Sequence, residues 1–133
     1  MVVPRFVRCA LLNQPLEVYG DGTQSRCFAD VIDVINAVEK LSEHPAAVGQ
    51  VFNIGSTQEI TILELAHRII QLTSSKSEIK LVPYEEAYAP GFEDMHRRVP
   101  CIDKIHQLIG YLPRCSLDET LMRVINYERE KIL

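Results

Sequence analysis

Residues 15–28, Pro-Leu-Glu-Val-Tyr-Gly-Asp-Gly-Thr-Gln-Ser-Arg-Cys-Phe, hold two short apolar stretches on either side of a glycine-containing loop. The stretches Leu16 to Tyr19 and Ser25 to Phe28 have the length and the side chains of strands. The glycines of Gly20-Asp21-Gly22-Thr23 permit the positive φ angles that a tight connection needs. The segment therefore predicts a β-hairpin or a sharp loop between two strands.

A helix is predicted on each side of this segment. Before it, Pro4 suits the first turn of a helix that stops near Asn13 and Pro15, because a missing N–H costs nothing in a first turn. After it, Asp30 can cap a helix that ends before Pro45. The apolar side chains of this second helix form one stripe. They are Val31, Val34, Ile35, Val38 and Leu41.

Two further strands and a long loop are predicted. Val51 to Ile54 is a short apolar run of the kind found in buried strands, and Ile79 to Val82 is another that stops at Pro83. The segment from Tyr84 to Pro100 has neither helical nor strand periodicity, which predicts a surface loop with one helical turn in it.

Three more helix boundaries have clear local signals. Thr61 with Glu64 and Ser116 with Glu119 are capping boxes, in which a hydroxyl and a carboxylate satisfy the free N–H groups of a helix start. A short helix over residues 102–109 would end at Gly110. Helices interleaved with short strands indicate an α/β or α+β fold without a long parallel sheet buried on both faces.

Composition limits the classes of protein to which the chain can belong. At 133 residues, 47% of them hydrophobic, one hydrophobic core is expected and a membrane span is not. The net charge is −4 and the basic residues are scattered, which argues against a nucleic acid or a membrane as the partner. Four cysteines without a C-x-x-C pair, and no secretory signal, predict reduced thiols in the cytoplasm. No spacing typical of a zinc site occurs, so no metal is predicted.

Cofactor and catalytic motifs are absent from the sequence. No G-x-G-x-x-G follows a strand and no Walker-type glycine loop occurs, so this chain alone is expected to hold no dinucleotide. Tyr127 and Lys131 have the spacing of a catalytic tyrosine–lysine pair, but helices fray at chain ends and no Ser or Thr partner can be identified. No catalytic residue is therefore predicted.

Arginines occur in two segments that the sequence predicts to be exposed. Arg26 follows the glycine loop, and Arg97 and Arg98 end the long loop, with Arg97 the weaker candidate. Guanidinium groups bind phosphate oxygens as bidentate forks, so two of them converging would suit a diphosphate. Ordinary surface arginines are the alternative. Tyr19 could stack on a base, or it could be a core tyrosine.

Five segments occur in an order that spans nearly the whole chain. They are Val-Val-Pro-Arg-Phe-Val (2–7), the 15–28 run quoted above, Val-Phe-Asn-Ile-Gly (51–55), Arg-Arg-Val-Pro (97–100) and Ser-Leu-Asp-Glu (116–119). Together they resemble the C-terminal half of the extended short-chain dehydrogenases/reductases. Within that family the chain looks most like the UDP-glucuronate decarboxylases, UDP-glucose 4-epimerases and dTDP-glucose 4,6-dehydratases. These enzymes bind NAD and oxidise the sugar transiently at C4.

The resemblance implies that residues 1–133 form a single nucleotide-sugar-binding domain, a small mixed α/β lobe without its Rossmann half. It also implies that Arg26 and Arg98 contact the diphosphate of a UDP- or dTDP-sugar, and that Val18 and Tyr19 line the pocket for the base and ribose. NAD and the catalytic tyrosine and lysine would belong to the N-terminal half. The chain alone is therefore expected to be inactive.

Other hypotheses remain open. The chain could be a non-enzymatic binding module or the remnant of a truncated gene, or its N-terminal half could be supplied in trans. Apolar surface that the missing half would otherwise cover favours self-association, so a homo-oligomer is also possible.

Overall fold

The computed structural model describes residues 1–87 and 95–132, and the contacts within it divide the chain into two compact units. Unit 1 comprises residues 1–26, 60–97 and 121–133, and unit 2 comprises residues 27–59 and 98–120. Residues 27–59 contact residues 98–120 within unit 2, and the expectation of a single domain with one core stays a prediction. No helix within the described ranges is long and apolar enough to cross a membrane.

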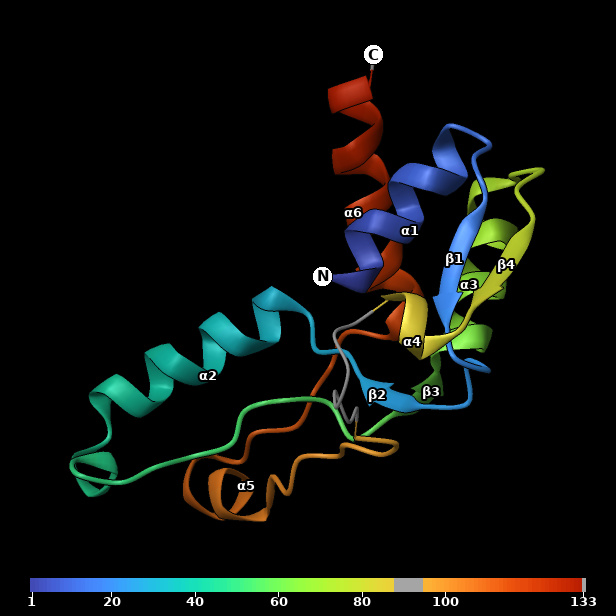
Figure 1. The fold of residues 1–133 in the computed structure, drawn as a ribbon. Coiled ribbons are helices and arrows are strands. Elements are labelled where there is room, and N and C mark those ends of the chain that lie inside the picture. Colours follow the sequence, from blue (N-terminus) through green and yellow to red (C-terminus); the bar gives the residue numbers. More distant parts are fainter. Residues whose placement is uncertain (88–94, 133) are drawn as a thin grey trace. The chain divides into compact units, whose positions relative to one another are not determined.

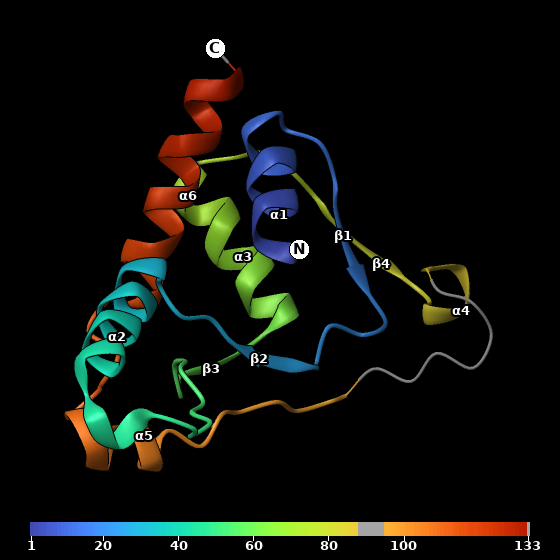
Figure 2. The ribbon, with the colours of Figure 1, turned by 90° about the vertical axis from the view of Figure 1, so that its left-hand side faces the viewer.

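Unit 1 is built around a parallel pair of strands, β1 (Leu16–Tyr19) and β4 (Ile79–Val82). Leu16 lies opposite Ile79 and Tyr19 lies opposite Val82, and Figure 1 shows the two strands side by side. Helices α1 (Val2–Leu11) and α3 (Ile62–Thr73) contact β1 and each other, and Figure 2 shows their packing from another side. The mixed α/β fold predicted from the sequence is confirmed.

The core of unit 1 follows from amphipathic helices whose apolar faces meet. The largest fully buried side chains of this unit come from α1, β1, α3 and α6 (Leu117–Ile132). They are Phe6, Val7, Leu16, Val18, Leu65, Ile69, Leu121 and Ile125. Helix α3 begins as predicted: Thr61 Oγ1 accepts a hydrogen bond from the backbone N–H of Glu64, and a Glu64 carboxylate oxygen accepts one from the backbone N–H of Thr61.

The hairpin predicted for residues 15–28 does not form. Strand β1 pairs with β4, and β2 (Ser25–Cys27) pairs with β3 (Glu59–Thr61), so that β1 and β2 share no ladder. The sharp loop between them is present, with φ angles of 67° at Gly20 and 75° at Gly22. A Cβ atom at Gly22 would lie 2.8 Å from Val18 Cγ1, so only glycine fits there.

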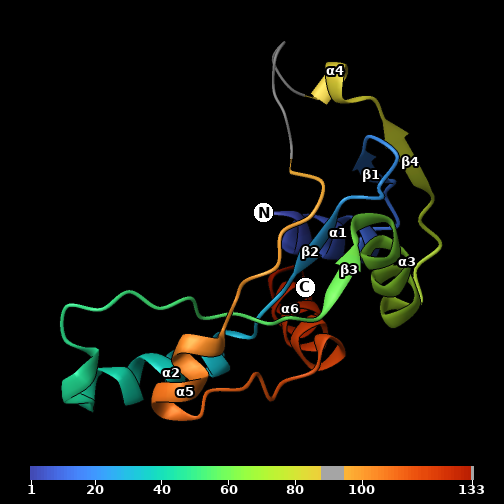
Figure 3. The ribbon, with the colours of Figure 1, turned by 90° about the horizontal axis from the view of Figure 1, so that it is seen from below.

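Unit 2 contains α2 (Val31–Glu43), the 3₁₀ turn η1 (Pro45–Ala47) and α5 (Asp103–Ile109). Asp30 caps α2 as predicted, because its Oδ1 accepts a hydrogen bond from the backbone N–H of Ile32 at 2.9 Å. Helices α2 and α5 contact each other (Figure 3). Their contact includes a small buried cluster made of Ala37, Ile102, Ile105 and Tyr111.

One prediction for unit 2 is wrong, and one predicted feature is largely exposed. Three members of the apolar stripe of α2 are largely in solvent, with Val31 64%, Ile35 59% and Val38 52% exposed, because α2 packs through Ala37 and, of the stripe, Leu41. Residues 51–54 form no strand, since no described strand lies along them to pair with.

The segment from Tyr84 to Pro100 contains one helical turn, α4 (Tyr84–Ala87), as predicted. Residues 88–94 of the predicted loop lie outside the described residues. Beyond them, Ser25 and Arg97 form an isolated parallel bridge. Gly110 ends α5 in the left-handed conformation, with a φ angle of 68°, which confirms the predicted cap.

Candidate functional site

A hollow of about 320 Å³ lies within unit 1. Residues of α1, β1, the loop after β1, β2 and the start of α3 line it, among them Arg5, Glu17, Tyr19, Gln24 and Arg26. Two of the four predicted binding residues, Tyr19 and Arg26, therefore line the same hollow. Both belong to unit 1, so this arrangement is a property of one compact unit.

The glycine loop that leads from β1 into β2 is held by its own polar side chains. Asp21 Oδ1 accepts hydrogen bonds from the backbone N–H of Thr23 at 3.0 Å and from the Thr23 hydroxyl at 2.7 Å. These two bonds lower the pKa of Asp21. At the end of the loop, Gln24 Nε2 donates to the backbone oxygen of Tyr19 at 3.0 Å. The loop thus fixes the direction in which the chain leaves β1.

Tyr19 is accompanied by a residue that the sequence analysis did not single out, Arg5 of α1. The Arg5 Nη1 donates to the Tyr19 hydroxyl, and Nη2 donates to the backbone oxygen of Glu17 at 2.8 Å. The guanidinium carbon lies 4.6 Å from the centroid of the Tyr19 ring. Arg5 stands in the quoted run 2–7, but its role becomes visible only once α1 packs along β1.

Arg26 is half-buried, and its Nη1 donates to the backbone oxygen of Ser25 at 2.7 Å. Ser25 is bridged to Arg97, and the Ser25 N–H donates to the backbone oxygen of His96 at 2.8 Å. Arg26 and Arg98 are thus the residues that follow the two partners of this bridge. Arg98 is exposed and belongs to unit 2, so the convergence of the two guanidinium groups stays a prediction.

Val18 does not line the hollow. Its side chain is fully buried in unit 1, and its residue lies opposite Leu81 in the β1–β4 pair. A role for Val18 in binding a base stays a prediction. In the structure, Val18 is a core residue of unit 1.

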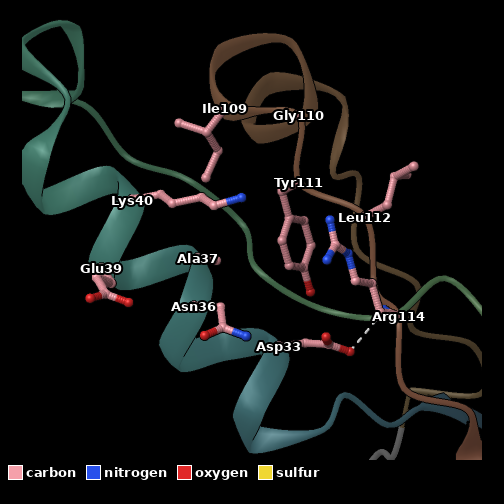
Figure 4. A pocket seen from close by; sticks show the side chains of 10 residues that line it. All are labelled: Asp33, Asn36, Ala37, Glu39, Lys40, Ile109, Gly110, Tyr111, Leu112 and Arg114. Carbon is pink, nitrogen blue, oxygen red and sulfur yellow. Dashed lines mark hydrogen bonds between the residues drawn. The ribbon is translucent and has the colours of Figure 1, made fainter.

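A second hollow, of about 190 Å³, lies within unit 2 between α2 and the segment after α5 (Figure 4). Asp33 Oδ2 accepts hydrogen bonds from the backbone N–H groups of Arg114 at 3.0 Å and Cys115 at 2.9 Å. The Tyr111 hydroxyl donates to the backbone oxygen of Gly55 at 3.0 Å. Burial and the nearby Asp33 charge raise the pKa of Tyr111. The Asp33 carboxylate and the Tyr111 hydroxyl therefore connect distant segments of unit 2. Their hydrogen bonds to backbone groups offset the cost of burying them.

Comparison with known proteins gives a consistent result along the chain. The family model of the NAD dependent epimerase/dehydratase family matches residues 1–55. The UDP-N-acetyl-alpha-D-glucosaminuronate decarboxylase of Bacillus cytotoxicus is 40% identical over 129 residues, which are 97% of this chain and 40% of the relative. UDP-glucuronic acid decarboxylase 2 of Arabidopsis thaliana is 36% identical over 131 residues, 98% of this chain and 28% of the relative.

Solved structures agree with these sequence relatives. An epimerase from Methanothermobacter thermautotrophicus has a TM-score of 0.89 at 28% identity, and the match covers 99% of this chain and 38% of that one. UDP-glucuronic acid 4-epimerase from Bacillus cereus, in complex with UDP-glucuronic acid and NAD, has a TM-score of 0.86 at 25% identity, over 98% of this chain and 40% of that one. The chain therefore spans two fifths or less of the length of these proteins.

Proposed function

We propose that the chain is part of a member of the NAD dependent epimerase/dehydratase family, to which its sequence and fold are similar, and that it binds the nucleotide part of a UDP- or dTDP-sugar. The full-length protein would be a decarboxylase, epimerase or dehydratase acting on that sugar. The described residues would position the substrate by its nucleotide, and the fragment by itself would be catalytically silent.

The observation that carries this proposal is the unit 1 hollow. It combines an aromatic ring, Tyr19, with a guanidinium, Arg26, on elements of one compact unit. A ring face suits a base or ribose, and a guanidinium fork suits phosphate oxygens. The names of the sequence relatives point to UDP-sugars, which contain both kinds of group.

NAD would not be held by the residues described here. A dinucleotide cradle needs a glycine-rich turn that leads from a strand directly into a helix, so that the helix N-terminus can face the pyrophosphate. In this chain, β1 leads through its glycine loop into another strand, β2, and β3 enters α3 through Thr61 without a glycine. The cofactor of the full-length protein would therefore need residues outside this chain.

A titration with UDP tests the proposal. Amide chemical shifts of the isotope-labelled chain should change around residues 16–26 as UDP is added. Arg26→Ala should weaken binding roughly 10- to 150-fold, because it removes one charge-assisted interaction worth about 1.5 to 3 kcal/mol. Arg8→Ala, on the exposed side of α1, is the matched control and should bind UDP like the wild type.

Two results would contradict the proposal. One is a chain that shows no shift at millimolar UDP although it is folded. The other is an Arg26→Ala variant whose affinity for UDP equals that of Arg8→Ala.

A second candidate function is favoured by the exposed stripe of α2. Val31, Ile35 and Val38 are each more than half exposed on one helix, which suits a module that binds another protein or a second copy of itself. Size-exclusion chromatography with light scattering tests this: the wild type should self-associate as its concentration rises, and Val38→Lys should shift it toward the monomer. A wild type that stays monomeric and does not bind UDP would leave neither candidate supported.

A further inference from the structure

We infer that Arg5 is a second phosphate-binding residue of the unit 1 hollow, acting beside Arg26. The inference rests on the proposed nucleotide binding, and it adds a contact that the sequence did not predict. Arg5 lies on α1 and Arg26 on β2, and both line the hollow.

The guanidinium of Arg5 is held in one orientation before any ligand arrives. It rests against the Tyr19 ring, donates to the Tyr19 hydroxyl, and donates to the backbone oxygen of Glu17. Both hydrogen bonds go to neutral oxygens. A fork fixed in this way loses little conformational entropy when it binds an anion, because its rotamer is already set.

The charge of Arg5 has no carboxylate partner among residues 1–87 and 95–132. Glu17 lines the same hollow, but the contact with Arg5 is through the Glu17 backbone oxygen. A guanidinium has five N–H groups, and the two bonds described above use two of them. Three N–H groups therefore remain for the oxygens of an anion.

Gln24, which also lines the hollow, carries a buried side-chain oxygen without a donor. The residue is buried, with 6% of its surface exposed, and its Nε2 donates to the Tyr19 backbone oxygen. Its Oε1 has no hydrogen-bond partner. A buried acceptor left unpaired is costly in a folded protein, so a missing donor is the natural explanation.

These groups together define the chemistry of the ligand. Arg5 and Arg26 call for a group with several anionic oxygens, and Gln24 calls for an N–H or O–H donor on the same molecule. A nucleoside diphosphate carries both, since its base and ribose supply donors next to the phosphates. Inorganic pyrophosphate has only the first feature and a nucleoside only the second, which makes them useful separate probes.

The test compares three ligands on the full 133-residue chain by isothermal titration calorimetry. UDP, pyrophosphate and uridine are each titrated into the wild type, Arg5→Ala, Arg26→Ala and Arg8→Ala. Arg5→Ala is expected to weaken UDP and pyrophosphate binding roughly 10- to 100-fold while uridine binding changes little. Arg8→Ala removes the same charge from an exposed position of the same helix and should change none of the three.

The outcomes distinguish a failure of the Arg5 inference from a failure of the proposed nucleotide binding. If Arg26→Ala weakens UDP binding and Arg5→Ala does not, the role of Arg5 is overturned and nucleotide binding stands. If Arg5→Ala weakens uridine as much as UDP, Arg5 acts through the Tyr19 ring rather than on phosphate, and the inference is wrong. A folded wild type that binds neither UDP nor pyrophosphate overturns both.

One further variant covers a failure to fold. If Arg5→Ala is unstable, Arg5→Gln keeps an amide donor near Tyr19 and Glu17 but removes the charge. A folded Arg5→Gln chain with wild-type affinity for pyrophosphate overturns the inference, and one with the expected loss supports it.

Discussion

The two units use their amphipathic helices in opposite ways. In unit 1, α3 buries its apolar side, with Leu65 and Ile69 fully inaccessible to solvent. In unit 2, α2 leaves Val31 and Val38 more than half exposed and packs through a narrow contact around Ala37. Sequence periodicity is similar in the two helices, so the difference lies in what the rest of the chain places against each.

This difference shows that burial is decided by the partner surface and not by the helix alone. Unit 1 supplies β1 and α1 to cover α3. Among the described residues, Val31, Ile35 and Val38 of α2 stay more than half exposed, and the chain spans about 40% of the length of its Bacillus cytotoxicus relative. The exposed part of the α2 stripe is thus apolar surface that only a further surface could bury.

The largest expected effect separates the two helices directly. Leu65→Ala in α3 should lower the free energy of unfolding by about 2 to 5 kcal/mol, because it opens a cavity in a fully buried position. Val38→Ala in α2 should change it by less than about 0.5 kcal/mol, because most of that side chain is already in water. Urea denaturation followed by circular dichroism measures both, and similar losses for the two variants would break the comparison.

The next effect concerns the hydrogen bonds that stabilise unit 2, whose buried cluster is small. Asp33→Ala should cost about 1 to 3 kcal/mol, because the N–H groups of Arg114 and Cys115 would lose their acceptor. Asn36→Ala, at an exposed position of the same helix, is the control and should be nearly neutral. Thermal unfolding of both variants gives the result, and an Asp33→Ala chain as stable as Asn36→Ala would remove this bond pair from the account of unit 2.

A smaller effect is expected at the start of α3. Thr61→Ala should destabilise the chain by about 1 kcal/mol, because the hydroxyl no longer accepts the Glu64 N–H. Thr61→Ser keeps that acceptor and should recover most of the loss. Equal melting temperatures for the Ala and Ser variants would show that the capping box adds nothing measurable to unit 1.

The smallest effects come from pH, and they should fall on different units. Hydrogen bonds from the Thr61 N–H and hydroxyl hold the pKa of Glu64 below its usual 4.5, so this stabilisation is complete above pH 4.5 and is lost as the pH falls through the lowered value. Burial and Asp33 raise the pKa of Tyr111 above 10.0, so its neutral form stabilises unit 2 below pH 10 and that gain is lost as the pH rises.

Methyl NMR signals can follow the two units separately. Ile69 of unit 1 should respond first in acid and Ile105 of unit 2 first in alkali, since both are fully buried reporters. Simultaneous changes in both signals at either extreme would mean that the two units unfold as one.

Local structure was predictable from the sequence because its causes are local. The Thr61–Glu64 box, the Asp30 cap and the Gly110 cap all depend on residues within a few positions of one another. Long-range pairing was not predictable in the same way. The hairpin at residues 15–28 failed because the backbone of β1 is bonded to β4, which lies more than 60 residues further along the chain.

The candidate site was only partly accessible to sequence reasoning. Tyr19 and Arg26 were identified because they flank a recognisable loop, and the structure places both at one hollow. Arg5 was missed, since its position on a helix says nothing of β1 until the two pack together. Which residues of the α2 stripe are exposed does not follow from the sequence for a similar reason, because hydrophobic periodicity does not identify the surface that a helix meets.

The interleaved order of the two units has a consequence for synthesis. Unit 1 draws on three stretches of chain, and the last of them is residues 121–133, where Leu121 and Ile125 complete its buried core. When the ribosome has synthesised α1 and β1, most residues of unit 1 are still missing. Strand β1 can form its ladder only after β4 has been synthesised. Nascent chains stalled before residue 79 should thus be open to proteases along β1, while released chains are protected there.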